Sequence, residues 1–336
     1  MKFGSIPVES ALGSIAAHTL RLPKSTIKKG TILGRDEIAA LHAAGISEIT
    51  AATAAPGDLL EDEAAARLAA AVAGRHLSGR GAKTGRVNLY SDAAGVALID
   101  RGLVDRLNRL DPALTLATAS PYAPVAVGEM VATIKIIPYA APAAAVEAAE
   151  ALCRTAKPIA VAPYALRRVA VVATSAPSLR TSVMDKTRRV LDERLAPTGA
   201  AVTDEIRVPH ETGAVTDAIG RMVGGAEMLV LFGASAVTDG GDVIPAAIRA
   251  AGGEVLQVGI PVDPGNLLVL GHIGAMPVIG APGCARSPRE NGFDWVLQRL
   301  LAKVPVTASD LTGLGVGGLL KEIASRKEPR ERADVD

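Results

Sequence analysis

The sequence predicts an α/β protein with a strand-rich α+β N-terminal domain, followed by a mostly parallel sheet covered by helices on both faces. The first observation is that strand-like and helix-like segments alternate after residue 166. The second is that residues 83–140 hold short Val-, Ile- and Thr-rich segments separated by Gly and Pro, which is typical of short strands. The third is the length of 336 residues, which indicates more than one domain.

The first segments predict mixed local structure. Residues 5–22 indicate a short helix followed by a strand-like segment. Asp36 is a suitable N-cap for a helix over residues 37–44, and Gly45 is suitable for ending it. Residues 59–74 predict a longer helix, because acidic residues near its start complement the positive end of the helix dipole.

Residues 83–140 predict antiparallel strands around one helix. Lys135 lies within one of these strands. Strand alternation favours a side chain that points outward, and contact with an anionic ligand is the alternative. A connecting helix is expected over residues 141–156, and two prolines then indicate a domain boundary near residue 165.

The second domain is predicted from alternating strands and helices. Ser182 and Asp185 form a capping-box-like start for its first helix. Asp242 is the expected N-cap of a later helix, because Pro245 is tolerated only in a first turn. The expected strands cover residues 167–174, 200–208, 227–233 and 254–259, with a hairpin over 267–280 that turns near Gly274, and the expected helices cover 181–199, 213–223, 242–253 and 287–304.

These segments predict three parts of the chain. Residues 1–160 form the N-terminal α+β domain, residues 166–306 form the α/β domain, and residues 307–336 form a partly disordered C-terminal extension.

Composition narrows the classes of partner. A net charge of +1 and an aromatic content of 2% disfavour nucleic acid, which needs basic surface and stacking side chains. No segment has the length and apolar character of a membrane span or a signal peptide. Cys153 and Cys284 form neither a metal-binding spacing nor a disulfide framework. We therefore expect a cytoplasmic protein.

Five connections that follow predicted strands are expected to meet at one edge of the sheet, where open parallel sheets bind their ligands. Turn and cap chemistry explains any one of these connections, because Gly, Ser and Asp are common in turns. Five such connections at one edge favour a ligand site. They cover residues 174–182, 208–213, 232–242, 259–266 and 280–290, and the first two supply Ser178, Thr181, Ser182 and His210 as candidate ligand contacts.

Two of these connections suit a phosphate group. Gly233 and Ser235 precede one predicted helix, and Gly283 and Ser287 precede the last one. Glycine lets backbone N–H groups approach an anion, and the following helix N-terminus adds its positive dipole end.

Charged side chains supply further chemistry. Asp239 and Asp242 are candidates for holding Mg²⁺ or for accepting hydrogen bonds from a nitrogen heterocycle, although Asp242 serves equally well as a plain N-cap. Arg286 and Arg289 are suitable partners for phosphate.

Other motifs are weaker. The run GLGVGG at residues 313–318 follows no predicted strand, so it lacks the context of a nucleotide-binding loop. The histidines are scattered without zinc-site spacing. Cys284 has no evident histidine partner and there is no GxSxG motif, so a triad hydrolase is disfavoured.

Three segments in order and spacing resemble the molybdopterin-binding family of molybdenum cofactor biosynthesis, which includes molybdopterin adenylyltransferase and molybdopterin molybdenumtransferase. They are LVLFGASAVTDGGDVIPAAI (229–248), VDPGN (262–266) and APGCARSPRE (281–290). The N-terminal segments ALGSIAAHTLRL (11–22) and IKKGTILGRDEIAALHAAGI (27–46) are similar to the molybdenumtransferase-like branch.

The resemblance implies a ligand, cofactors and site residues. The ligand is molybdopterin, with Mg²⁺ and with ATP or adenylylated molybdopterin as further substrates. Asp242 and Asp239 take the catalytic positions, and Asp242 is also the metal ligand. The motif residues that contact the ligand are Gly233, Ser235, Pro264, Gly265, Pro282, Gly283, Arg286 and Ser287.

The chain departs from the motifs at several positions. Phe232 replaces the first glycine of a pair, and His210 and Glu211 stand where the family has an acidic residue. Catalysis by molybdate insertion or adenylyl transfer therefore stays open beside two alternatives, a non-catalytic carrier of molybdenum cofactor and a nucleotide-binding oxidoreductase. The implied partners are molybdenum enzymes, other cofactor-biosynthesis proteins and further copies of the chain in a homo-oligomer.

Overall fold

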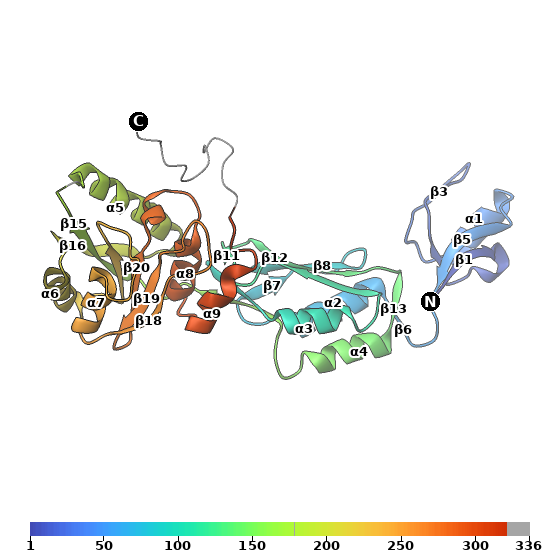
Figure 1. The fold of residues 1–336 in the computed structure, drawn as a ribbon. Helices are drawn as coiled ribbons and strands as arrows, with labels where there is room; N and C mark the ends of the chain where they lie inside the picture. The colour runs from blue at the N-terminus through green and yellow to red at the C-terminus, as the bar shows by residue number, and fades with distance from the viewer. Residues whose placement is uncertain (178, 321–336) are drawn as a thin grey trace, which may run out of the picture. The chain divides into compact units, whose positions relative to one another are not determined.

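The computed structural model describes residues 1–177 and 179–320 (Figure 1). The chain divides into two compact units, Met1–Pro163 and a second unit that begins at Tyr164. Both units combine helices with strands, so the predicted α/β class is confirmed. Within the described residues, no helix is both long enough and apolar enough to cross a bilayer.

The start of the first unit is a small sheet with one helix. Strand β5 (Glu48–Thr53) lies between β1 (Lys2–Pro7) and β2 (Ile15–Ala16), and both pairings are antiparallel. The short helix predicted at the start of residues 5–22 is wrong, because residues 5–7 pair with β5 and only the 3-10 turn Val8–Ser10 follows. The strand-like segment predicted after it is confirmed by β2 and by the strand at Leu20–Arg21. Further elements are β3 (Leu20–Arg21), β4 (Thr26–Ile27) and α1 (Arg35–Ala43).

The predicted N-cap of helix α1 is also wrong. The cap is Gly34, and the carboxylate of Glu37 accepts from the Gly34 N–H at 2.9 Å. Asp36 lies one position inside the first turn, where its charge still favours the helix dipole.

The rest of the first unit confirms the antiparallel strands predicted over residues 83–140. A four-stranded sheet has the order β10-β12-β8-β7, and all of its pairings are antiparallel. Alternate residues of its strands bury Leu89, Ile134 and Ile136 against the alanine-rich face of α2. The strands are β6 (Asp58–Leu60), β7 (Leu77–Gly79), β8 (Arg86–Ser91), β9 (Gly95–Ile99), β10 (Leu114–Thr118), β11 (Pro124–Val125), β12 (Met130–Ile136), β13 (Ala140–Pro142) and β14 (Ile159–Pro163), and the helices are α2 (Glu61–Val72), α3 (Arg101–Asn108) and α4 (Ala143–Leu152).

Lys135 in β12 has partners inside this unit. Its ammonium forms an ion pair with Glu61 at 3.2 Å and donates to the carbonyl oxygen of Thr84 at 2.9 Å. The side chain is therefore held by protein groups rather than projecting freely from the strand.

The second unit is built on a six-stranded sheet of order β16-β15-β17-β20-β19-β18. Its first three pairings are parallel, and its last two, β20 with β19 and β19 with β18, are antiparallel. Two antiparallel pairings in succession restore the direction, so β18 runs the same way as the four parallel strands. The bounds are β15 (Arg168–Ser175), β16 (Ala201–Pro209), β17 (Met228–Phe232), β18 (Glu254–Val258), β19 (Val269–Ile273) and β20 (Met276–Ala281).

Helices cover both faces of this sheet, as predicted (Figure 1). On one face, α6 (Thr212–Met222) and α7 (Val243–Ala250) pack against alternate apolar residues of the strands. The other face packs against α8 (Gly292–Leu301), where the ring centroids of Phe232 and Phe293 lie 6.5 Å apart. Helix α5 (Thr181–Leu195) also buries an apolar stripe.

The helix boundaries confirm some predictions and correct others. Asp242 caps α7, and the β19–β20 hairpin turns at Gly274 with φ of 55°. Ser182 does not cap α5, whose N-cap position is Arg180 without a side-chain hydrogen bond. The last long helix begins at Gly292 rather than at residue 287.

The later start of α8 has a local cause. The Asn291 side chain accepts from the N–H of Phe293 at 3.1 Å, and Asp294 accepts from the N–H of Asn291 at 2.8 Å. This capping box sets the helix start, and the preceding residues form the 3-10 turn Gly283–Arg286 and a loop.

The predicted C-terminal extension is structured where it is described. Helix α9 (Ala308–Thr312) and the 3-10 turn Gly313–Gly315 follow α8. The expectation of partial disorder falls on residues 321–336, which lie outside the described residues.

Candidate functional site

The candidate site is the edge of the second unit's sheet where β15, β16, β17, β18 and β20 end. Because these five strands run in one direction, their following connections all leave this edge. We call these connections the rim; within the described residues they cover 176–177, 179–180, 210–211, 233–242, 259–268 and 282–291. These are the five connections that the sequence predicts to meet at one edge of the sheet.

A chain of hydrogen bonds joins three of the strand ends. The Thr174 hydroxyl at the end of β15 lies 2.8 Å from Nδ1 of His210, which follows β16. Nε2 of His210 lies 2.8 Å from the hydroxyl of Ser235, which follows β17. Thr174 is buried and Ser235 is exposed, so the chain runs from the protein interior to the surface of the rim.

Thr174 was not among the predicted site residues. Its hydroxyl also accepts from the N–H of Ala234 at 2.6 Å and donates to the carbonyl oxygen of Phe232 at 3.2 Å. The signal in the sequence is a threonine that directly follows the apolar run 169–173, because a hydroxyl among buried residues needs hydrogen-bond partners.

Arg286 joins the connection after β20, in which it lies, to the connection after β17 and to helix α5. It donates to the carbonyl oxygen of Gly233 and to the hydroxyl of Thr187, each at 2.8 Å. Its guanidinium lies 5.6 Å from the centre of the Phe232 ring, and burial lowers its pKa from the ordinary value. Arg286 therefore holds protein groups that shape the rim, and its contact with phosphate stays a prediction from the sequence.

The two candidate catalytic carboxylates lie in the connection after β17. Asp242 accepts from the N–H groups of Val243 at 2.8 Å and Thr238 at 3.2 Å, one on each oxygen. Oδ1 of Asp239 accepts from the N–H of Gly241 at 2.7 Å. Both side chains stabilise the local backbone, and each carboxylate oxygen has a further lone pair for an outside partner.

Asp239 and Asp242 could supply only part of the ligand shell of a Mg²⁺ ion. Among residues 1–177 and 179–320, no three His, Cys, Asp or Glu side chains gather as a metal cluster. Mg²⁺ at phosphate-transfer sites typically takes one or two carboxylates and completes its shell with water and substrate phosphate oxygens. Asp239 and Asp242 suit that arrangement only with a phosphate-bearing substrate present.

Arg194 organises the connection after β20, and sequence reasoning missed it. Its guanidinium donates to the carbonyl oxygens of Ala285 at 2.8 Å and Ser287 at 2.7 Å and forms an ion pair with Asp294 at 2.5 Å. Only 7% of its side chain is exposed. Its position next to the buried Leu195 of an amphipathic helix was the available signal.

The Pro264–Gly265 pair brings the connection after β18 against the start of α8. The carbonyl oxygen of Pro264 accepts from the N–H of Gly292 at 2.9 Å. Gly265 has φ of 134°, and a Cβ on it would lie 2.5 Å from the Gly292 nitrogen. Only glycine fits here, so this motif residue has a structural reason to be present.

The glycine-rich run at residues 313–318 borders the same connection. The N–H of Asp263 donates to the carbonyl oxygen of Gly318 at 2.8 Å, and Leu320 donates to that of Asp263 at 2.9 Å. The end of this run is therefore hydrogen-bonded through its backbone to the connection after β18.

The remaining predicted residues fall into three groups. Ser178 lies outside the described residues. Thr181 and Ser182 are exposed in the first turn of α5. Pro282 is buried and precedes the 3-10 turn that contains Gly283, and the hydroxyl of Ser287 accepts from the N–H of Arg289 at 3.4 Å.

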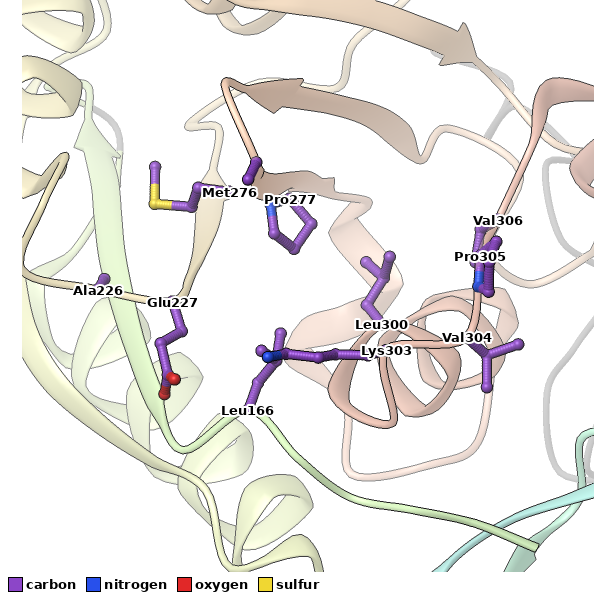
Figure 2. A pocket seen from close by; sticks show the side chains of 11 residues that line it. Leu166, Ala226, Glu227, Met276, Pro277, Leu300, Lys303, Val304, Pro305 and Val306 are labelled. Carbon is purple, nitrogen blue, oxygen red and sulfur yellow. The ribbon is translucent and has the colours of Figure 1, made fainter.

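A separate apolar pocket opens at the opposite edge of the sheet (Figure 2). It measures about 560 Å³ and includes Leu166, Met276 and Pro277, which lie at strand starts rather than strand ends. Glu227 in its wall accepts from the N–H groups of Arg167 and Arg168, and these bonds lower the pKa of its carboxyl group. None of the predicted site residues lines this pocket.

Comparison with known proteins gives one family match and several structural likenesses. Residues 5–53 match a domain of unknown function, DUF8806. No curated protein matches the chain.

The similar solved structures are described as molybdopterin biosynthesis proteins. MoaB from Thermus thermophilus is 19% identical, with a TM-score of 0.32 over 44% of this chain and 98% of that one. MoeA from Pyrococcus horikoshii is 14% identical, with a TM-score of 0.31 over 90% of this chain and 75% of that one. The Mog protein from Mycobacterium ulcerans is 13% identical, with a TM-score of 0.28 over 41% and 99%. Likenesses of this size carry no information about the activity of this chain.

Proposed function

We propose that the rim binds molybdopterin and that the chain acts in molybdenum cofactor biosynthesis. The observation that carries the proposal is the hydrogen-bonded chain of Thr174, His210 and Ser235, which joins three strand ends at one edge. A solvent-facing hydroxyl supported by a buried polar chain suits a polar ligand, because open parallel sheets bind ligands at this edge.

The motif residues support the same place. Gly233 and Ser235, Pro264 and Gly265, and the segment 282–287 lie on three connections of the rim. These are the segments in which the sequence resembles the molybdopterin-binding family.

The polar groups along the rim match the parts of the ligand. Molybdopterin carries a pterin ring with N–H donors and carbonyl acceptors, and a terminal phosphate. The exposed Asp239 and Ser235 suit the heterocycle, while the exposed Thr181 at the start of α5 suits the phosphate, where the helix dipole favours an anion.

The proposed reaction, for a catalytic protein, is molybdate insertion into molybdopterin or its adenylylated form. Asp239 and Asp242 would hold Mg²⁺ together with substrate phosphate oxygens, and the ion would neutralise charge on those oxygens. The chain's own part is to position the ligand against the connection after β17.

A non-catalytic carrier is the second candidate, and one observation favours it. Both oxygens of Asp242 already accept from backbone N–H groups that build the helix start. A carboxylate held by two backbone N–H groups is less free to reorient toward a metal ion. The carrier would hand bound cofactor to a molybdenum enzyme.

Two measurements separate these possibilities. Calorimetric titration of purified protein with molybdopterin tests binding, and absence of binding contradicts both candidates. Adenylylated molybdopterin with molybdate and Mg²⁺ then tests turnover, which supports the transferase and contradicts the carrier.

Titration with NAD and NADP tests the oxidoreductase alternative from the sequence. Homo-oligomer formation and a cytoplasmic location stay predictions from the sequence.

A further inference from the structure

We infer that Thr174 locks His210 in the Nδ1–H tautomer, and that His210 thereby makes the Ser235 hydroxyl a hydrogen-bond acceptor toward the ligand, so that Ser235 meets the N–H donors of the heterocycle and not the phosphate. The ligand part of this inference rests on the proposed function. The tautomer itself does not, because it follows from contacts within the protein.

The assignment begins at the Thr174 hydroxyl, which has one proton and two lone pairs. Its oxygen lies 3.2 Å from the carbonyl oxygen of Phe232. Of the two neighbours that could take the Thr174 proton, the carbonyl oxygen can only accept, whereas Nδ1 of His210 can accept or donate. The Thr174 proton therefore points to Phe232, and both lone pairs of Thr174 accept.

The N–H of Ala234 takes one of these lone pairs at 2.6 Å. The other faces Nδ1 of His210 at 2.8 Å. Because Thr174 has no proton left for this contact, Nδ1 must carry the hydrogen. All three hydrogen-bonding positions of the buried hydroxyl are then used, as expected for a group without access to water.

In neutral imidazole one nitrogen donates and the other accepts, so Nε2 of His210 is the acceptor. Ser235 lies 2.8 Å from Nε2 and must donate its only proton there. What Ser235 offers to the outside is its pair of acceptor lone pairs. A ligand N–H complements them, whereas a phosphate oxygen would meet lone pairs with lone pairs.

Ser235 is exposed at the rim and therefore accessible to a ligand. The Gly233 backbone lies close to the imidazole, since a Cβ on Gly233 would come within 3.7 Å of His210 Cε1. From the hydrogen-bond directions above, His210 is a positioning residue: Thr174 decides which nitrogen of His210 carries the proton, and His210 decides where the Ser235 proton points.

The first test is ¹⁵N–¹H correlation NMR of the imidazoles in the full-length protein at alkaline pH, where imidazoles are neutral. The His210 signals are identified by their loss in His210→Gln. We expect the pattern of a protonated Nδ1 and an unprotonated Nε2. A protonated Nε2 in the wild type would overturn the inference while leaving pterin binding open to its own test.

The second test measures binding of two probes, unsubstituted pterin and inorganic phosphate, by calorimetry. Ser235→Ala is expected to weaken pterin binding roughly three- to tenfold, the loss of one hydrogen bond, and to leave phosphate binding unchanged. Weaker phosphate binding with unchanged pterin binding refutes the assigned polarity. A wild type that binds no pterin refutes the proposed function and the ligand part together, and the NMR result still reports the tautomer.

The third test reverses the polarity with Thr174→Val, which keeps the shape and removes the hydroxyl. His210 should then shift toward the Nε2–H tautomer, the Ser235 proton should turn outward, and pterin binding should fall while phosphate binding rises. Thr174→Ser is the matched control that keeps the hydroxyl and should keep the wild-type tautomer. If Thr174→Val does not fold, the wild-type spectrum and Ser235→Ala still decide the outcome.

Discussion

The guanidinium of Arg286 donates to the carbonyl oxygen of Gly233 at 2.8 Å and so joins the connection after β20 to the connection after β17. A second bond reaches Thr187 of α5, and the guanidinium carbon lies 5.6 Å from the centre of the Phe232 ring. One side chain therefore joins two connections of the rim and helix α5.

Replacing Arg286 should destabilise the second unit. Lysine cannot make both bonds in the same geometry, so we expect Arg286→Lys to lower the free energy of unfolding by about 1–3 kcal/mol. Urea denaturation measures this change. The exposed Arg289 is the matched control, and Arg289→Lys should change stability by less than about 0.5 kcal/mol. Equal effects of the two variants would contradict the role of Arg286.

Replacing Arg194 should also destabilise the second unit, because this side chain holds the connection after β20. Arg194→Met leaves Asp294 and the two loop carbonyl oxygens without their buried partner, and we expect a loss of about 3 kcal/mol. Thermal unfolding followed by circular dichroism measures it. Arg189→Met, on an exposed position of the same helix, should be close to neutral, and a comparable loss there would argue against a special role.

Asp242 combines a helix cap with a proposed ligand contact, and two variants separate these roles. Asparagine keeps the N-cap acceptor, so Asp242→Asn should retain most stability, whereas Asp242→Ala should lose about 1 kcal/mol. Molybdopterin affinity in the presence of Mg²⁺ should fall in both variants, because both lose the charge. Wild-type affinity in a folded Asp242→Asn protein would reduce Asp242 to a cap.

Gly265 should tolerate no side chain. Gly265→Ala places a Cβ 2.5 Å from the Gly292 nitrogen at a φ of 134°, and such strain costs on the order of 1–3 kcal/mol or more. The control is Gly283→Ala, where a Cβ meets nothing within 4 Å. A differential scanning calorimetry experiment should show a lower Tm for the first variant and little change for the second, and the reverse order would contradict the steric role of Gly265.

Glu227 should contribute to stability in a pH-dependent way. Bonds from the N–H groups of Arg167 and Arg168 lower its carboxyl pKa from the ordinary 4.5. Its contribution is therefore fully present above that ordinary value and is lost as the pH falls through the lower native pKa. Glu227→Gln should flatten the acid limb of the stability curve, measured by urea titrations between neutral and acid pH. An unchanged acid limb would contradict this assignment.

Local pattern predicted most of the second unit because each of its elements has a clear period. The strand predicted at residues 227–233 contains the continuous apolar run 228–232, and Asp242 with Pro245 limits where the next helix starts. The helix prediction for the N-terminal segment was wrong because a long-range contact decided its structure. Its helix prediction rested on local pattern, and pairing with β5, more than forty residues away in sequence, decided its conformation.

Convergence of the rim could be predicted because the topology of parallel strands places their carboxyl ends together. The roles of individual residues could not. Only the fold shows that Arg286 donates to a carbonyl oxygen and to the Thr187 hydroxyl, and that Arg194 donates to loop carbonyl oxygens and pairs with Asp294.

The sequence by itself determined the α/β class, the alternation of the second unit and the positions of the glycines and hydroxyls along its rim, because these depend on short-range periodicity and on turn chemistry. Only the tertiary structure decided that Thr174, His210 and Ser235 form one hydrogen-bonded chain. Their polarity depends on where a single buried proton points, and that is set by the approach of three strand ends that are distant in the sequence.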